Sequence, residues 1–347
     1  MSIVVLKLPD VKRKTEARPS KCLYCEGETF QRWGEVNKPV KDVRVRNVKV
    51  YRYRGGRCKR TFRQYPAGNT RADQTERLRL FAVLLWTLGL SYRAGSLILS
   101  GLKVMVSFMT IWRDVQAEAQ QIKKHNQWKA VRILGLDGAY VLGWGEKQPV
   151  LVAVDLGTGE PLTLGYVNEY DPQAVQRWLA SLVQRHGITV IVTDDLSSYK
   201  VVAEKLQLGH QVCQFHVRRW VGKTLKDLQE TIPKPWLWVL DDIRQVLDVL
   251  PPDGSKTLYA LWKQLPGRRS LPNQARSALE QLRDLLLRLC EHWQTYCAFQ
   301  SEPQVPWTNN ATERAIGRMK MRARTVRGYK SWQGMAAGLM LAGSYAR

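Results

Sequence analysis

The sequence of 347 residues predicts a mixed α/β protein in which a sheet-containing domain is interrupted by a group of helices. Three aliphatic, strand-like runs follow one another at 131–137, 149–155 and 162–167. Helical and strand-like patterns then alternate up to residue 230, and leucine-rich helical segments fill residues 231–300. At this length, and with 44% hydrophobic residues, we expect roughly two or three domains with cores of their own.

The sheet-containing domain is predicted at 129–230 and 301–347, on either side of the helical insertion. Its first three strands are close enough in sequence to form an antiparallel meander. The elements that follow are a helix at 173–185, a strand at 188–193, a helix at 197–206, a strand at 210–215 and a further helix. This order is typical of the RNase H-like fold, in which the first and fourth strands lie side by side at the centre of the sheet.

Two aspartates end strands that this fold makes neighbours. Asp137 is expected at the end of the first strand, and Asp194 directly follows the strand at 188–193. A single aspartate in such a place is ordinarily a turn cap. Two carboxylates on neighbouring strands repel each other, however, and a divalent cation makes such a pair tolerable. The pair therefore predicts a metal site, with Asp195 as the alternative to Asp194.

Residues 21–68 are typical of a small zinc-ribbon-like β module. A C-x-x-C pair, Cys22 and Cys25, precedes an alternating, strand-like segment at 43–53, and Cys58 follows it. A four-thiolate zinc site requires a second such pair, but Gly55 stands where its first cysteine is expected. Three thiolates can still hold Zn²⁺, so the sequence leaves open both a zinc site and three unrelated free cysteines.

Residues 69–128 predict helices at 74–88 and 92–99 and a third helix with Ser107 as its cap. In a basic chain, short helices joined by a turn are typical of a helix-turn-helix DNA-binding domain, and a plain helical bundle is the alternative. Residues 1–20 are basic and without a periodic pattern, and we expect them to form a loose arm.

The balance of charges predicts a polyanionic partner. The chain carries 54 Lys and Arg against 30 Asp and Glu, a net charge of +24, which favours DNA or RNA over a membrane surface. We recognise no signal peptide, lipidation motif or apolar run long enough to span a bilayer, and expect no membrane partner. The six cysteines fit thiols or a metal site in a reducing cytoplasm better than disulfides.

Near the C-terminus, Thr308 or Asn309 is expected to cap a helix that carries Glu313 in its first turn. This helix is strongly basic, and we expect five of its cations to follow a nucleic acid backbone: Arg314, Arg318, Lys320, Arg322 and Arg324. A glutamate among so many cations is ordinarily an ion-pair partner on the helix surface. The alternative is that Glu313 joins the two aspartates at the metal site.

Short motifs, specific in their order and spacing, carry a resemblance to a known family. They are Leu136-Asp137-Gly138, Val192-Thr193-Asp194-Asp195, Cys213-Gln214-Phe215-His216, Thr308-Asn309-Asn310 with Glu313-Arg314, and Arg327-Gly328-Tyr329-Lys330-Ser331. On these residues the chain resembles DDE-type transposases of bacterial and archaeal insertion sequences, in the branch related to Mutator-like elements. The resemblance spans nearly the whole chain, and Gly55 departs from the family's pattern.

The resemblance implies that Asp137, Asp194 and Glu313 form a DDE triad that holds two Mg²⁺ or Mn²⁺ ions. It also implies that Cys213 and His216 form a C-x-x-H motif that positions the second aspartate and contacts DNA; a packed thiol and a hydrogen-bonded histidine are favoured there over zinc. The implied reaction is metal-dependent hydrolysis at transposon ends, followed by strand transfer into target DNA.

The partners implied by the resemblance are transposon-end DNA, target DNA and further copies of the chain, in a homodimer or a larger synaptic assembly. The implied location is the prokaryotic cytoplasm, in association with the nucleoid. Two alternatives remain open from the sequence: a non-catalytic DNA-binding regulator, and an inactive protein derived from a transposase.

Overall fold

The chain folds as two compact units, Met1–Ile122 with Met321–Arg347 and Lys123–Lys320. The computed structural model describes residues 8–15, 17–141, 143, 149–267, 273–326 and 328–344, apart from the side chains of 273–277. Three predicted features lie partly outside these residues: the basic arm at 1–7 and Glu16, the helical insertion at 268–272, and Arg327 of the last motif. Residues 321–347, expected with the sheet domain, cluster with the N-terminal unit.

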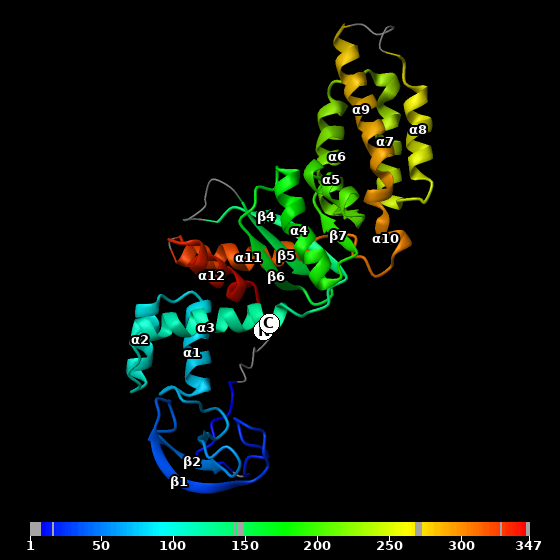
Figure 1. Cartoon of the computed structure of the whole chain (residues 1–347). Coiled ribbons are helices and arrows are strands. Elements are labelled where there is room, and N and C mark those ends of the chain that lie inside the picture. The colour runs from blue at the N-terminus through cyan, green and yellow to red at the C-terminus, as the bar shows by residue number, and fades with distance from the viewer. Residues whose placement is uncertain are drawn as a thin grey trace. The chain divides into compact units, whose positions relative to one another are not determined.

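The N-terminal unit contains a three-stranded antiparallel sheet with the order β1-β2-β3 (Figure 1). The strands are β1 (Phe30–Pro39), β2 (Asn47–Gly55) and β3 (Thr61–Gln64). The strand expected at 43–53 begins only at Asn47, because Asp42 accepts hydrogen bonds from the amides of Arg44 and Val45 and turns the chain there. One buried cluster of this sheet is apolar and contains Tyr53, whose ring is stacked on that of Phe62.

Three helices follow, α1 (Glu76–Thr87), α2 (Tyr92–Gly101) and α3 (Phe108–Asn126), of which α3 ends in the first residues of the second unit. Ser91 caps α2, as expected from the sequence, whereas α1 begins two residues later than expected, at Glu76, with Thr75 as its cap. Their shared core consists of Leu78, Ala82, Leu99, Val104, Val106 and Ile111. The C-terminal helix α12 (Trp332–Ser344) adds Leu341 to a second cluster around Val83 and Trp86.

The second unit is built on a five-stranded sheet with the order β6-β5-β4-β7-β8. The strands are β4 (Ile133–Ala139), β5 (Val150–Asp155), β6 (Glu160–Gly165), β7 (Val190–Thr193) and β8 (Gly209–Val212). The first three pair antiparallel, whereas β4 with β7 and β7 with β8 pair parallel. The expectation that the first and fourth strands are neighbours is confirmed by the pairing of β4 with β7.

Two strand ends differ from the sequence expectation. Asp137 lies within β4 rather than at its end, because β5 continues to pair with β4 as far as Ala139. On its other side β4 pairs with β7 only as far as Gly135, so Asp137 lies beyond the last residue that pairs with β7. The strand expected at 210–215 ends at Val212, and the next helix, α6 (Gln214–Gln229), already begins at Gln214.

One face of the five-stranded sheet is covered by α4 (Pro172–His186) and α5 (Ser197–Lys205). Asp171 caps α4 through hydrogen bonds from the amides of Gln173 and Ala174, and Gly187 ends it in the left-handed conformation. The packed interface combines Leu134, Leu136, Leu151 and Ala153 of the sheet with Val175, Leu179, Tyr199 and Val202 of the helices. This core fixes the strand ends from which the candidate site is built.

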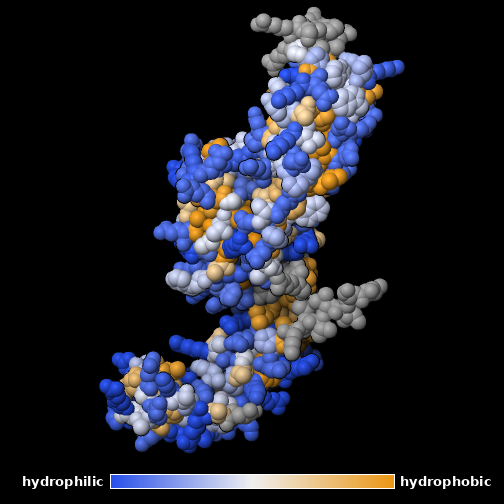
Figure 2. Space-filling model, turned by 90° about the vertical axis from the view of Figure 1, so that its right-hand side faces the viewer, coloured by the Kyte–Doolittle hydropathy of each residue, from blue (hydrophilic) through white to orange (hydrophobic). Residues whose placement is uncertain are grey.

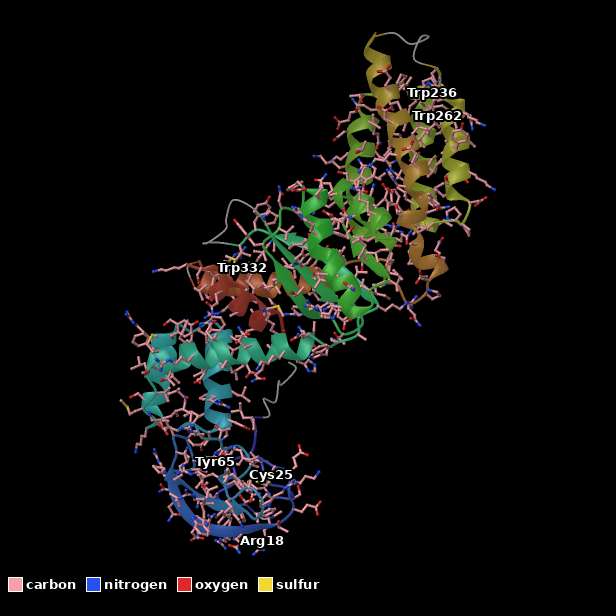
Figure 3. All side chains as sticks on the ribbon, in the orientation of Figure 1. Arg18, Cys25, Tyr65, Trp236, Trp262 and Trp332 are labelled. Atoms are coloured by element: carbon pink, nitrogen blue, oxygen red, sulfur yellow. The ribbon has the colours of Figure 1, made fainter. Side chains whose placement is uncertain are left out.

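A bundle of helices forms the rest of the second unit, with α6 to α9 running side by side (Figure 1). Its elements after α6 are a short 3-10 helix at Lys234–Trp236, α7 (Leu237–Val249), α8 (Gly254–Gln264), α9 (Asn273–Tyr296) and α10 (Ala298–Ser301). Trp236 and Trp262 pack against its aliphatic core (Figure 3). No helix among the described residues is long and apolar enough to cross a membrane.

Candidate active site

Asp137 lies in β4, and Asp194 directly follows the neighbouring strand β7. Burial, together with the charges of Asp194 and Glu169, raises the pKa of Asp137 from 3.8 to about 7. Burial also raises the pKa of Asp194. One carboxylate oxygen, Asp194 Oδ1, is buried without a hydrogen-bond partner. These are the properties of a carboxylate pair that lacks a compensating positive charge.

Asp195, the alternative to Asp194, has a different set of contacts. Its carboxylate forms ion pairs with Lys200 at 2.6 Å and with Arg288 of α9 at 2.5 Å. The hydroxyl of Tyr296 lies 3.3 Å from the same group. Because Asp195 is fully compensated by these cations and Asp194 is not, the contacts favour Asp194 as the residue that faces a metal.

Glu313 lies in the first turn of α11 (Asn310–Thr325), as expected from the sequence. Asn309, which precedes the helix, is buried and donates a hydrogen bond from Nδ2 to the Leu136 carbonyl at 2.9 Å. Its Oδ1 accepts a hydrogen bond from the Thr312 hydroxyl, and its carbonyl accepts one from the Glu313 amide. Asn309 therefore fixes the start of the Glu313 helix to the strand residue next to Asp137.

His216 contacts Glu313 and influences the two aspartates through its charge. Its Nε2 lies 2.9 Å from Glu313 Oε1, and its charge acts to lower the pKa values of Asp137 and Asp194. Among the described residues, Glu313 shares a ligand group within 4.8 Å with Cys213 and His216 rather than with the two aspartates. In the structure Glu313 thus contacts His216 rather than the aspartate pair.

Cys213, the other member of the C-x-x-H motif, is fully buried at the start of α6. Its Sγ accepts a hydrogen bond from the Asn309 amide at 3.3 Å, and burial raises the pKa of its thiol. The motif therefore connects α6 to α11 twice, through Cys213 to Asn309 and through His216 to Glu313. A packed thiol and a hydrogen-bonded histidine agree with these contacts.

A divalent, oxygen-preferring cation such as Mg²⁺ or Mn²⁺ fits the aspartate pair. Hard cations favour carboxylate oxygens, and the uncompensated Asp137 and the orphaned oxygen of Asp194 supply such ligands. Glu313 is held by His216 in the structure, so its addition to the pair would require its side chain to turn away from His216.

Glu169 is a member of this neighbourhood that the sequence did not reveal. It lies in the loop between β6 and α4, is 7% exposed, and accepts a hydrogen bond from the Tyr199 hydroxyl at 3.0 Å. Burial and the charge of Asp194 raise its pKa. The segment Asn168-Glu169-Tyr170-Asp171 reads simply as a loop and helix cap, and no periodic pattern marks Glu169 as buried.

The three N-terminal cysteines converge in the small β module, where Figure 3 labels Cys25. The ligand atoms of Cys22, Cys25 and Cys58 lie within 4.8 Å of one another, and the Cys22 and Cys58 sulfurs are 3.7 Å apart. A Cβ atom at Gly55 would lie 2.8 Å from Cys58 Sγ and 3.0 Å from Cys22 Sγ. A side chain at position 55 would therefore enter the cluster, and the two sulfur atoms would have to shift to admit it.

The basic residues of α11 divide into exposed and buried cations. Arg314 and Arg324 are exposed, and Arg318 and Lys320 are half-buried. For Arg322 the expected contact with a nucleic acid backbone is wrong. Its side chain is 3% exposed, and its guanidinium lies 4.0 Å from the centroid of the Trp86 ring. It also donates to the Leu90 carbonyl, so it stabilises the N-terminal unit. Hydrophilic side chains predominate on the face shown in Figure 2.

Comparison with known families gives a match over residues 165–337, which extends from the end of β6 into α12. The matching model describes transposases of the IS66 family. The matched segment includes Asp194 and Glu313, whereas Asp137 precedes it. No curated protein matches the chain. The match does not single out the Mutator-like branch, and it supports an insertion-sequence transposase of the DDE type, similar to the IS66 family.

Proposed function

We propose that the chain is a DNA transposase that hydrolyses phosphodiester bonds at transposon ends and joins the released ends to target DNA. Its active site would consist of Asp137, Asp194 and Glu313. The observation that carries the proposal is the uncompensated Asp137–Asp194 pair beside a helix start that carries Glu313. The family match over residues 165–337 supports the same class of activity.

Asp137, Asp194 and Glu313 would hold the divalent cations that this chemistry requires. When bound, such cations activate the attacking oxygen and stabilise the charge on the leaving oxygen. Asp137 would lie between the other two ligands, because its strand adjoins both β7 and the start of α11. Glu313 would exchange its contact with His216 for the metal centre, and the freed imidazole could then face a DNA phosphate.

The fold of the second unit supports this assignment. Its strand order β6-β5-β4-β7-β8, with two antiparallel and two parallel pairings of neighbouring strands, supports the RNase H-like arrangement expected from the sequence. We therefore propose that Lys123–Lys320 contains an RNase H-like catalytic core with the α7–α9 bundle as an insertion. In the other unit, we propose that the β1–β3 module and helices α1 to α3 bind transposon-end DNA, with the three cysteines as a candidate Zn²⁺ site.

A cleavage assay tests the proposal. The full chain is incubated with Mn²⁺ or Mg²⁺ and DNA duplexes that carry the inverted repeats flanking its coding region, and nicked and joined products are measured. We expect Asp137→Asn, Asp194→Asn and Glu313→Gln each to abolish cleavage while DNA binding is retained. Glu204→Gln removes an exposed carboxylate of α5 and is the matched control, with cleavage expected at the wild-type level.

Two outcomes would contradict the proposal. Cleavage by Asp137→Asn at the wild-type rate would remove Asp137 from the active site. A wild-type chain that binds the end duplexes tightly but cleaves none of them with either cation would favour the DNA-binding regulator or the inactive protein.

A further inference from the structure

We propose that Glu169 is a fourth carboxylate of the metal centre, which approaches Asp137 from the α4–α5 face of the sheet. The inference rests on the proposed function, and it adds to the centre a residue outside the expected DDE set. Three observations carry it: the close approach of Glu169 to Gly138, the way in which its carboxylate is held, and the absence of a cationic partner among the described residues.

The position of Glu169 follows from its contact with β4. A Cβ atom built on Gly138 would lie 2.1 Å from Glu169 Oε2, so the carboxylate occupies the space that a side chain at 138 would fill. Gly138 follows Asp137 directly and shares a strand face with Leu134 and Leu136, which pack against α4 and α5. Glu169 therefore reaches the Asp137 backbone from that face, and only glycine at 138 leaves room for it.

Two contacts tie Glu169 to the segment that follows Asp194. Its carbonyl accepts a hydrogen bond from the Ser198 hydroxyl at 2.5 Å, and its Oε2 accepts one from the Tyr199 hydroxyl at 3.0 Å. Both donors lie in the first turn of α5, and Tyr199 is fully buried. The carboxylate is thus fixed between the strand of Asp137 and the helix after Asp194, which is the preorganisation that a metal ligand requires.

Glu169 differs from the buried carboxylates Asp42 and Asp155 in lacking a cation among the described residues. Asp42 pairs with Arg77 at 2.6 Å, and Asp155 pairs with Lys129 at 2.7 Å. Among the residues that the structure describes, no Lys or Arg forms an ion pair with Glu169. A buried carboxylate without a partner is costly, and the orphaned Asp194 Oδ1 indicates that the same neighbourhood lacks a positive charge.

The charges of the four carboxylates explain why a site for two divalent cations would include Glu169. Asp137, Asp194, Glu313 and Glu169 together can carry four negative charges, and two divalent cations would neutralise them. With three carboxylates alone, two such cations would be left with an excess positive charge at the site. Glu169 would therefore strengthen binding of the ion on the α4–α5 side of Asp137, and its loss should weaken that ion more than the other.

The test measures Mn²⁺ binding to the full chain by electron paramagnetic resonance, without DNA, beside the cleavage assay. The first variant is Glu169→Gln, which keeps the size and the Tyr199 contact but removes the charge. The second is Glu169→Asp, which keeps the charge but moves the carboxylate away from the site, because its side chain is one methylene shorter. Glu204→Gln is the charge-matched control. We expect Glu169→Gln to weaken at least one bound Mn²⁺ by about 10-fold or more and to require correspondingly more Mn²⁺ for cleavage, with Glu169→Asp intermediate.

The outcomes separate this inference from the proposed function. If Glu169→Gln binds Mn²⁺ as tightly as wild type while Asp137→Asn loses binding, Glu169 is not a ligand of the metal centre. The proposed active site is then unaffected. Mn²⁺ binding that is unaffected by Asp137→Asn, Asp194→Asn and Glu169→Gln alike overturns both. Circular dichroism spectra that match the wild type establish that the Glu169 variants fold. If Glu169→Gln fails to fold, Mn²⁺ binding is measured on Glu169→Asp instead.

Discussion

Replacing Asp137 by asparagine should stabilise the metal-free chain at neutral pH and above. Burial and the charges of Asp194 and Glu169 raise the pKa of Asp137 from 3.8 to about 7. Between these values the folded chain retains a proton that the unfolded chain has released. The free energy of unfolding therefore falls as the pH rises from about 4 to about 7, and it stays reduced at higher pH.

The magnitude follows from the interval between the two pKa values. At 1.36 kcal/mol per pKa unit, the interval from 3.8 to about 7 corresponds to about 4 kcal/mol of lost stability above pH 7. Asparagine has nearly the same size and no charge to desolvate, so Asp137→Asn should recover most of this free energy. For a unit of this length, about 4 kcal/mol corresponds to a rise in melting temperature on the order of 10 °C.

Thermal unfolding followed by circular dichroism from pH 4.5 to 8.5, in the presence of a chelator, provides the measurement. We expect a small difference between Asp137→Asn and wild type at pH 4.5 and the full difference at pH 8.5. Millimolar Mg²⁺ should raise the melting temperature of wild type at pH 8.5 and should have little effect on the variant. Superimposable pH profiles for the two proteins, with Glu204→Gln as the control, would refute the electrostatic reasoning.

Three further predictions concern other parts of the chain. Gly55→Cys should complete a four-thiolate cluster with Cys22, Cys25 and Cys58 and increase Zn²⁺ affinity at least about 10-fold, measured by competition with a chromogenic chelator; unchanged affinity would mean that position 55 does not face the cluster. Asn309→Ala should cost about 1–3 kcal/mol of stability in denaturant unfolding and reduce cleavage, because the Leu136 carbonyl loses its donor; a fully active, equally stable variant would contradict the docking role. Arg314→Gln should reduce the slope of log K against log salt for DNA binding by about 1, whereas an unchanged slope would place Arg314 away from phosphates.

The strands and the aspartate pair were predictable because their signals are local. Aliphatic runs of strand length mark β4, β5 and β7, and an aspartate near the end of a run is visible in the sequence. The extent of β4 beyond Asp137 was not predictable, because it depends on pairing with β5. Once the element order had indicated which strands are neighbours, the proximity of Asp137 and Asp194 followed.

The remaining features depend on contacts between residues distant in sequence. His216 and Glu313 are 97 residues apart, and only the fold brings Nε2 to the carboxylate. Arg322 reads as one more cation of a basic helix, and its burial over Trp86 becomes visible only in the structure. Glu169 stands in an ordinary polar loop, and its proximity to Gly138 depends on how that loop packs against β4.

Diffraction from crystals soaked in Mn²⁺, recorded near the manganese absorption edge, tests whether Asp137 and Asp194 hold a divalent cation. We expect anomalous peaks within coordination distance, about 2.0–2.2 Å, of carboxylate oxygens of Asp137 and Asp194, with Glu313 turned away from His216. Manganese bound elsewhere, with Asp137 and Asp194 free of metal at pH 8 and saturating Mn²⁺, would contradict this expectation.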